Sequence, residues 1–297
     1  SASSSLTVKN GEMQLSGWDF RSDGSIELNG TWEFYWKQLL WPDDLQSTTS
    51  PEVSGYVEVP GYWTNHRLNG SPLPPDGYAT YRMVIRGLHP SDDVAIKLRN
   101  MYSSYALWVN DELEASSGQP GTTSDNTSPK YGASIVVPVE PSPEGSLTLL
   151  IQVSNFTYPK GGINNSLELG DAKLLQKERS GELVQDSLVI GALLVMGIYH
   201  LFLYGFRRKD VTPLYFGLFC MCIAFRTMLV GSRYILEILP GFSWEWFAKA
   251  SYLTVYVGEF FLISFIYYLF PQYLSRSVRR VTQMFTLILT LLVLTTD

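Results

Sequence analysis

The chain has 297 residues, of which 22 are Lys or Arg and 28 are Asp or Glu, giving a formal net charge of −6 at pH 7. Residues 1–186 hold 13 basic and 23 acidic side chains, whereas residues 187–297 hold 9 basic and 5 acidic. An acidic, Gly/Pro/Ser-rich first part and an apolar second part indicate two domains of different class, and the acidity argues against nucleic acid as a partner.

Short strand patterns separated by turn signals run from Met13 to about Leu175. Examples are Thr31–Trp36, Tyr78–Ile85 and Leu147–Val153, in which apolar side chains alternate or run together between Gly, Pro, Asn and Asp. Roughly nine such strands with no helical period between them predict an all-β antiparallel sandwich or jelly roll. We assign residues 1–175 to this domain, with a last strand expected over 167–175.

Four framework motifs in this domain follow one another in a recognisable order. They are Gly30-Thr31-Trp32-Glu33-Phe34, Val59-Pro60-Gly61-Tyr62-Trp63, Gly77-Tyr78-Ala79-Thr80-Tyr81-Arg82 and Leu107-Trp108-Val109-Asn110. In this order they resemble the sugar-binding jelly roll at the front of β-galactosidases and β-glucuronidases. The last motif departs from that family, because Asp111 follows Asn110 where Gly is usual. The resemblance covers about half the chain and implies a galactose-binding-like fold more than a ligand.

Apolar runs long enough to cross a bilayer begin at Ser187. Residues 187–206 form a run of about twenty residues without an acid or a base, which spans roughly 30 Å of hydrocarbon as a helix. Further spans are predicted at about 213–231, 251–270 and 281–297. A charged connector at 176–186 precedes the first span, and we interpret it alternatively as the first turn or two of a helix that continues into the membrane. The aromatic-rich segment 232–248 suits the membrane interface. The two cysteines, Cys220 and Cys222, lie in the second span and predict neither a disulfide nor a metal pair.

The loops between the spans carry a clear charge bias. Basic clusters lie at 207–209 and 276–280, whereas the loop between the second and third spans has Arg233 balanced by acids. The positive-inside rule therefore predicts a multi-pass protein of the plasma (inner) membrane with its N-terminal domain outside.

A β-sandwich outside the membrane, joined by a short connector to a helical bundle, resembles the bacterial seven-transmembrane receptors with diverse intracellular signalling modules. The resemblance implies an extracellular sensor domain, seven helices and a cytoplasmic output module. The sequence would then contain the first four helices and end within the fourth, at Asp297, without the output module.

Two charged side chains fall well inside the predicted spans, Arg226 in the second and Glu259 in the third. A charge at that depth needs a partner, so we expect an ion pair between the two side chains. The pair either fixes the two helices or rearranges on signalling. A proton relay is disfavoured, because the spans hold too few ionisable groups. His200 in the first span is expected to hydrogen-bond between helices, with a pH switch as the alternative.

Three loops could gather on one rim of the sandwich and form a ligand site. The candidate ligand-binding residues are Trp63, Asn65, Arg67, Tyr102, Asn155 and Tyr158. An aromatic platform beside amide and charged groups would suit a carbohydrate, although the sequence favours Trp63 as a core aromatic over a ligand platform. The acidic pairs Asp43-Asp44 and Asp92-Asp93 are interpreted as solvated, and we predict no metal site and no cofactor.

The sequence therefore favours a membrane receptor that senses an extracellular small molecule, carbohydrate in particular, and signals to a cytoplasmic module. It is not expected to be an enzyme within the given residues. The alternatives are an accessory domain of a membrane-tethered carbohydrate-active enzyme and a transporter or channel subunit with an outer lid. The expected partners are the ligand, the lipid bilayer and the signalling module, and a homodimer stays open.

Overall fold

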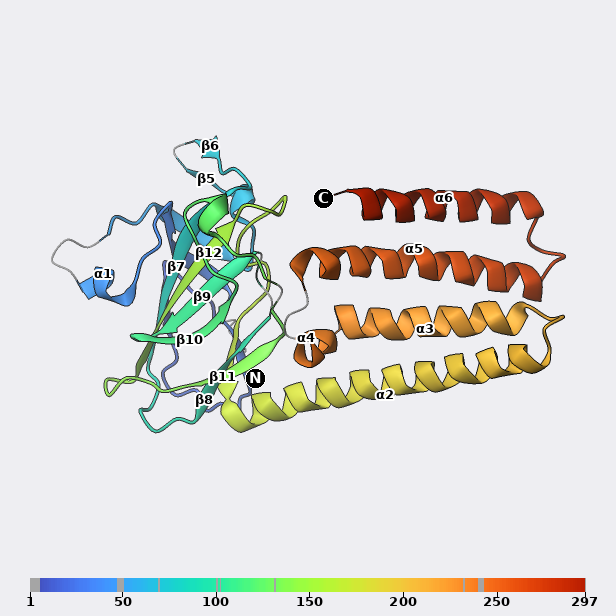
Figure 1. The fold of residues 1–297 in the computed structure, drawn as a ribbon. Helices are drawn as coiled ribbons and strands as arrows, with labels where there is room; N and C mark the ends of the chain where they lie inside the picture. The colour runs from blue at the N-terminus through green and yellow to red at the C-terminus, as the bar shows by residue number, and fades with distance from the viewer. Residues whose placement is uncertain are drawn as a thin grey trace. The chain divides into compact units, whose positions relative to one another are not determined.

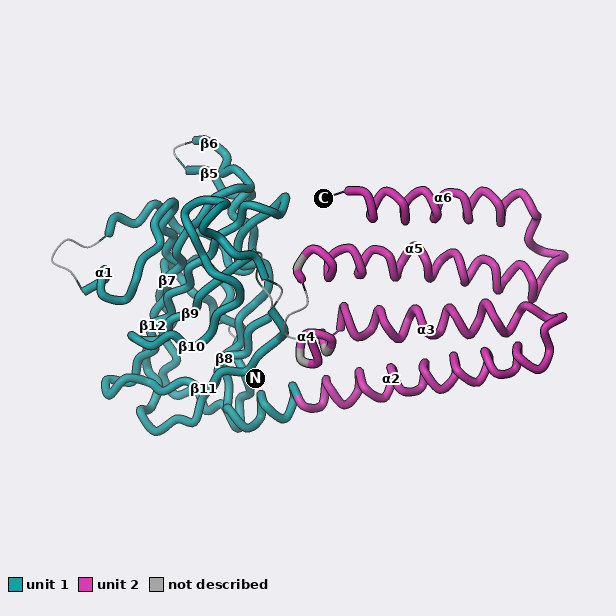
Figure 2. The backbone as a smooth tube through the Cα atoms, viewed as in Figure 1, with its two compact units in different colours: residues 1–179 teal, residues 180–297 magenta. Residues whose placement is uncertain are grey.

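The structure, a computed structural model, describes residues 6–46, 51–68, 70–99, 101, 103–130, 132–231, 233–239 and 243–296. The chain divides into two compact units, residues 1–179 and residues 180–297 (Figure 2). The first unit holds the strands, and the second holds long helices. Helix α2 (Ala172–Phe206) is continuous across the boundary between them.

The larger sheet of the first unit has the strand order β10-β9-β12-β7-β3-β4, and β1 pairs with β7 in parallel. Its longest ladder joins β7 and β12 along ten residue pairs, from Arg86 opposite Ser146 to Gly77 opposite Asn155. The strands are β1 (Glu12–Gln14), β3 (Gly30–Trp36), β4 (Gly55–Val59), β7 (Gly77–Arg86), β9 (Ser104–Val109), β10 (Glu112–Ser117) and β12 (Ser146–Asn155). The short helix α1 (Pro42–Gln46) lies between β3 and β4 in the chain.

A smaller sheet has the strand order β11-β8-β13-β2, with all its pairs antiparallel. Its strands are β2 (Ile26–Glu27), β8 (Val94–Leu98), β11 (Ile135–Val139) and β13 (Glu168–Asp171). A two-stranded ribbon, β5 (Arg67–Leu68) with β6 (Ser71–Pro72), projects separately (Figure 1).

One hydrophobic core joins the two sheets. Alternate residues of β7, such as Tyr81, Met83 and Ile85, are buried in the same cluster as Ile96 and Leu98 of β8 in the smaller sheet. Because successive side chains of a strand point to opposite faces, this alternation turns one face of each sheet toward the other. The predicted all-β sandwich is therefore confirmed, and the apolar helices follow it in the chain (Figure 1).

The end of the sandwich differs from the expectation for residues 167–175. Strand β13 stops at Asp171 and α2 begins at Ala172, so the charged segment 176–186 is helical. The Asp171 side chain accepts hydrogen bonds from the backbone N–H groups of Lys173 and Leu174, 3.0 Å each, and so caps the new helix. A capping carboxylate stabilises helical backbone where the strand pattern alone predicts extension.

The second unit consists of α3 (Thr212–Val230), the short α4 (Tyr234–Ile238), α5 (Trp244–Leu269) and α6 (Arg276–Thr295), together with most of α2. Among the described residues four helices are long and apolar enough to cross a membrane: α2, α3, α5 and α6. Helix α5 packs against both α3 and α6. Gly197 of α2 and Gly217 of α3 let those two backbones approach, since a Cβ added to either would lie about 3.0 Å from a neighbouring atom.

The helices start earlier than their apolar runs. Helix α5 begins at Trp244 rather than near 251, and α6 begins at Arg276 rather than 281. The hydroxyl of Ser275 accepts from Val278 N at 3.2 Å and caps α6. Hydropathy marks the part of a helix that fits lipid, whereas backbone hydrogen bonding extends it to the nearest cap. Phe242, part of the predicted interfacial segment, lies outside the described residues.

Candidate functional site

Trp63, the proposed aromatic platform, belongs to the core. Its side chain is fully buried, its Nε1 donates to the carbonyl oxygen of Pro74 at 2.9 Å, and its ring packs edge-on against Trp36. A Cβ added to Gly161 would lie 2.1 Å from the indole, so that glycine is where the loop crosses the ring. The ring therefore has no free face for a ligand.

Asn155 is also buried and serves the backbone. Its Nδ2 donates to the carbonyl oxygens of Pro75, 3.0 Å, and Tyr158, 2.8 Å, while its Oδ1 accepts from Tyr158 N at 3.0 Å. These bonds use both donors of the amide and close the turn that follows β12. The side chain holds this loop in place and is not presented to solvent.

The remaining predicted rim residues have different surroundings. Asn65 and Arg67 are exposed, and Arg67 Nη1 donates to Gly70 O at 3.1 Å; Tyr158 is half-buried, and Tyr102 lies outside the described residues. The segments themselves do meet, because Trp63 N donates to Gly161 O at 3.0 Å and Gly61 N to Ile163 O at 2.7 Å. The structure thus joins the predicted loops through buried framework contacts.

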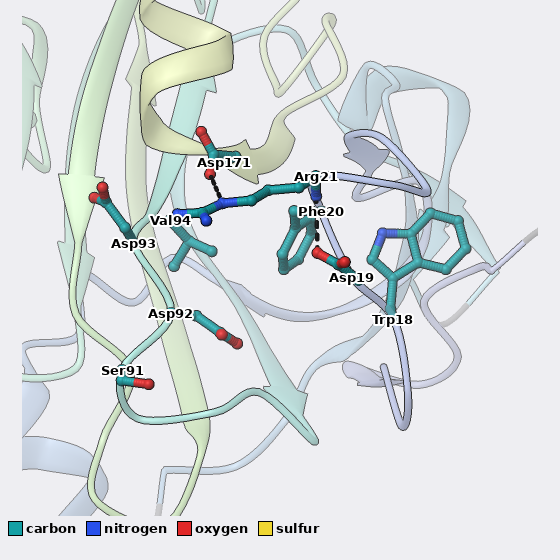
Figure 3. Close-up of a pocket in the computed structure, with 9 residues that line it drawn as sticks. All are labelled: Trp18, Asp19, Phe20, Arg21, Ser91, Asp92, Asp93, Val94 and Asp171. Carbon is teal, nitrogen blue, oxygen red and sulfur yellow. Dashed lines mark hydrogen bonds and ion pairs between the residues drawn. The ribbon is translucent and has the colours of Figure 1, made fainter.

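A cavity of about 380 Å³ lies where α2 leaves the sandwich (Figure 3). It is lined by Trp18–Arg21, Ser91–Val94 and Asp171. Arg21 Nε donates to the buried carboxylate of Asp171 at 3.1 Å. The same carboxylate caps α2. Burial alone would raise the pKa of Asp171, but the hydrogen bonds from Leu174 N, Arg21 and Lys173 N outweigh it and hold this pKa below its usual value.

The first two turns of α2 are fastened to the smaller sheet and its loops. Ala172 N donates to Asp93 O at 2.9 Å, and Lys173 Nζ lies 3.6 Å from an Asp93 carboxylate oxygen. Leu175 is buried against Gly170, and the buried Lys97 of β8 has its Nζ 3.9 Å from the Glu178 carboxylate. The first turns of α2 are therefore attached to the smaller sheet by a hydrogen bond, two ion pairs and apolar packing.

Sequence reasoning missed Arg21, Lys97 and Asp171. The signal for Lys97 was present: in Val94–Leu98 the lysine alternates with core residues, so it lies on the outer face of the sheet, and its near-complete burial means that another element covers that face. Arg21 and Asp171 lie 150 residues apart in the chain and carry no local signal of their contact.

An open acidic groove of about 870 Å³ runs along the start of β8, the start of β10 and the end of β11. Burial, with the charges of Glu112 and Glu140, raises the pKa of Glu114 in its lining. Asp92 and Asp93 line it as well, but the described residues contain no group of three or more His, Cys, Asp or Glu side chains placed to hold a metal ion.

In the helical unit Arg226 does not pair with Glu259. Its Nη1 donates to Ser251 O in α5 at 3.0 Å, and Glu259 lies eight residues further along that helix, about 12 Å at 1.5 Å per residue. Glu259 is instead exposed on a face of α5 that includes Tyr252 and Val255. The sequence places both charges inside spans, but the partner of Arg226 is a backbone carbonyl, which no side-chain pattern reveals.

Other polar groups of this unit also form contacts. The expected hydrogen bond of His200 to another helix is wrong, because its Nδ1 lies 2.8 Å from Met196 O in its own helix; only its ring reaches α3, where it packs edge-on against Phe216. Gln283 of α6 donates to the buried Ser264 hydroxyl of α5 at 2.8 Å. These are helix-positioning contacts of the kind that small polar groups form inside membrane bundles.

Comparison with known proteins gave two kinds of match, one to a family model and one to solved structures. Residues 182–297 match the model of the family described as 7TM diverse intracellular signalling. A β-glucuronidase from Ruminococcus gnavus is 10% identical with a TM-score of 0.36, over 49% of this chain and 28% of that one. A GH2 β-galacturonidase from Eisenbergiella tayi, bound to galacturonate, is 16% identical with a TM-score of 0.33, over 49% and 24%.

A GH2 member from Bacteroides cellulosilyticus DSM 14838 gives 14% identity and a TM-score of 0.37, over 49% and 20% of the two chains. The chain thus spans about a quarter of the length of these solved structures, and a likeness at this level bears on neither ligand nor activity. The comparison with curated proteins gave no match. From residue 182 onward the chain is similar to the 7TM diverse intracellular signalling family, and this match together with the four apolar helices supports a multi-pass membrane protein.

Proposed function

We propose that this chain is the sensing part of a membrane receptor. The sandwich lies outside the plasma (inner) membrane and binds a small molecule, carbohydrate in particular; helix α2 conveys the change to the bundle, which biases a cytoplasmic signalling module. The match of residues 182–297 to a signalling family supports the receptor class. The basic loops at 207–209 and 276–280 support the orientation.

The observation that carries the proposal is the continuity of α2. The helix runs for 35 residues from Ala172 to Phe206, and its first two turns are capped, hydrogen-bonded and ion-paired to the sandwich. A helix fixed at one end transmits a displacement or rotation, whereas a flexible linker of the same length would absorb it. Signalling then needs two arrangements of sandwich and helix, with the ligand favouring one of them.

The orientation can be tested by labelling single cysteines in intact cells. In a variant with Cys220 and Cys222 replaced by serine, Ser22→Cys marks an exposed turn of the sandwich and Lys209→Cys marks an exposed basic loop. A membrane-impermeant maleimide is expected to label Ser22→Cys directly and Lys209→Cys only after permeabilisation. The reverse pattern would overturn the proposal.

Sensing can be tested by thermal unfolding of the full chain in detergent, against mono- and oligosaccharides and cell-wall fragments. A ligand that binds only the folded state at a hundredfold excess over its Kd stabilises it by about 2.7 kcal/mol. A saturable upward shift with one compound supports a sensor. Hydrolysis of a chromogenic glycoside would instead favour an enzyme-associated domain, and solute flux through reconstituted protein would favour a transporter.

A further inference from the structure

The outer face of the smaller sheet carries an unusual row of charges. Lys97 of β8, Glu168 of β13 and Glu27 of β2 lie directly opposite one another on adjacent strands. Their neighbours Ile96, Leu169 and Ile26 are buried in the core, so the three charged side chains lie on the outer face. Two carboxylates directly opposite each other destabilise a sheet unless something compensates them.

Each of these carboxylates has one donor within the described residues. Glu168 accepts from the hydroxyl of Ser25, and Glu27 accepts from Asn29 Nδ2 at 2.7 Å. An ionised carboxylate has about four acceptor positions, so both retain capacity for further donors. Both also line the same cavity, which has a volume of about 240 Å³.

The rest of that cavity supplies unused hydrogen-bonding groups. Arg99, Asn164, Ser166 and Pro60 line it as well. The Oδ1 atom of Asn164 is buried without a donor, and exchanging the amide's oxygen and nitrogen would leave a buried donor in its place. Within the described part of the chain Arg99 forms no hydrogen bond or ion pair, so its guanidinium donors are unused by the described residues. A buried polar atom without a partner destabilises the fold until a ligand or water satisfies it.

We propose that this cavity binds a small, neutral, polyhydroxylated molecule of the size of a sugar ring. Arg99 can only donate hydrogen bonds and the two glutamates can only accept them, while a hydroxyl does both. Arg99 would repel a cation, and Glu27 and Glu168 would repel an anion. An apolar ligand would have a single apolar lining residue to pack against, Pro60. The inference rests on the proposed function and assigns its ligand to this site.

The position of the cavity explains how binding would reach α2. Glu168 is the cross-strand neighbour of Lys97, and Lys97 contacts Glu178 in the second turn of that helix. Hydroxyls that donate to Glu168 weaken the attraction of that carboxylate for Lys97, and so favour the contact of Lys97 with Glu178 that attaches α2 to the sheet. The ligand site and the helix anchor thus share one row of side chains.

The test is isothermal titration of the full chain in detergent with glucose, galactose, N-acetylglucosamine and glucuronate as probes. One of the neutral sugars is expected to bind saturably, with affinity lowered about tenfold or more in Arg99→Gln and in Asn164→Ala, since each removes a hydrogen bond to the ligand. Arg86→Gln is the matched control, because Arg86 is also an exposed arginine of the sandwich but lies on β7 of the larger sheet. It should leave the affinity unchanged.

The outcomes separate the site from the function. Saturable binding that survives both Arg99→Gln and Asn164→Ala would keep the sensor and refute this site. Preference for glucuronate over every neutral sugar would refute the ligand class. Absence of binding by all four probes refutes the inference as well, while cysteine labelling and the wider ligand panel still test the receptor. Unchanged hydrogen-exchange protection of β8 and β13 in the variants is required, so that unfolding is not mistaken for lost contacts.

Discussion

Replacing Trp63 by alanine distinguishes most sharply between a core residue and a ligand platform. The side chain is fully buried, and a buried tryptophan removes about 150–250 Å² from water, worth roughly 4–6 kcal/mol at about 25 cal/mol per Å². Measured Trp→Ala changes in cores fall at about 3–5 kcal/mol because the site relaxes in part. The substitution also leaves the Pro74 carbonyl without its donor. We expect the sandwich to lose about 3–5 kcal/mol of unfolding free energy.

Hydrogen exchange of the full chain measures this loss, because a chain with two units does not give one meaningful unfolding free energy. At about 1.4 kcal/mol per decade, the protection of the slowest amides of β3 and β7 should fall by between about 10² and 10³·⁵. Trp41→Ala is the control of the same residue type: Trp41 is 53% exposed and packs edge-on against Trp108, so about tenfold or less is expected. Protection that falls no further in Trp63→Ala than in the control would refute the core role.

Three further outcomes follow from the described contacts. Asp171→Ala should weaken the first turn of α2 by about 1–2 kcal/mol, as read by exchange of the capped amides. Asp171→Asn should weaken it less, because its amide oxygen still caps the helix but lacks the charge that Arg21 binds. Because the pKa of Asp171 is lowered on folding, the stabilisation by its carboxylate should persist at neutral pH and be lost only as the pH falls through the lowered pKa. Arg226→Met should lower the stability of the helical unit by roughly 0.6–2 kcal/mol, because it removes the hydrogen bond to Ser251 O, whereas Glu259→Gln should leave the stability unchanged. A larger loss in Glu259→Gln than in Arg226→Met would contradict this and support an ion pair between the two residues. Glu114→Gln should raise the stability of the sandwich by about 0.2–1 kcal/mol at pH 7. The pKa of Glu114 is raised in the folded state, so its charged form destabilises the fold, and the substitution removes that charge. The gain should vanish below the ordinary pKa of glutamate, where Glu114 is protonated in both the folded and the unfolded state.

Alternation and hydropathy predicted the class of each part of the chain. The pattern of Tyr78–Ile85 predicted β7, found at Gly77–Arg86, because a strand between a core and a second layer must alternate its side chains. The uncharged run at 187–206 predicted the membrane part of α2, because a span must match the thickness of the hydrocarbon. Both signals are local, and each can be read from the sequence without tertiary information.

The ends of elements were harder to predict. The segment 167–175 has apolar residues at both strand and helix spacing, and the change at Asp171 depends on a carboxylate that caps the helix and on a distant arginine, Arg21, that binds it. The connector at 176–186 is helical, as the second interpretation of this segment has it, and the first turns of α2 bury Leu175 and contact the smaller sheet. Such choices are made by contacts between residues far apart in the sequence.

The sequence by itself determined the two domain classes, the four apolar helices and the loops that meet around Trp63, since composition and period follow from the solvent that each segment faces. Only the tertiary structure decided that Trp63 and Asn155 are framework residues, that Arg226 binds the carbonyl of Ser251, and that Lys97 lies between a pair of glutamates and α2. The physical reason is that burial and pairing are properties of neighbours in space. A residue type tells which contacts a side chain can form, and the fold decides which of them it does form.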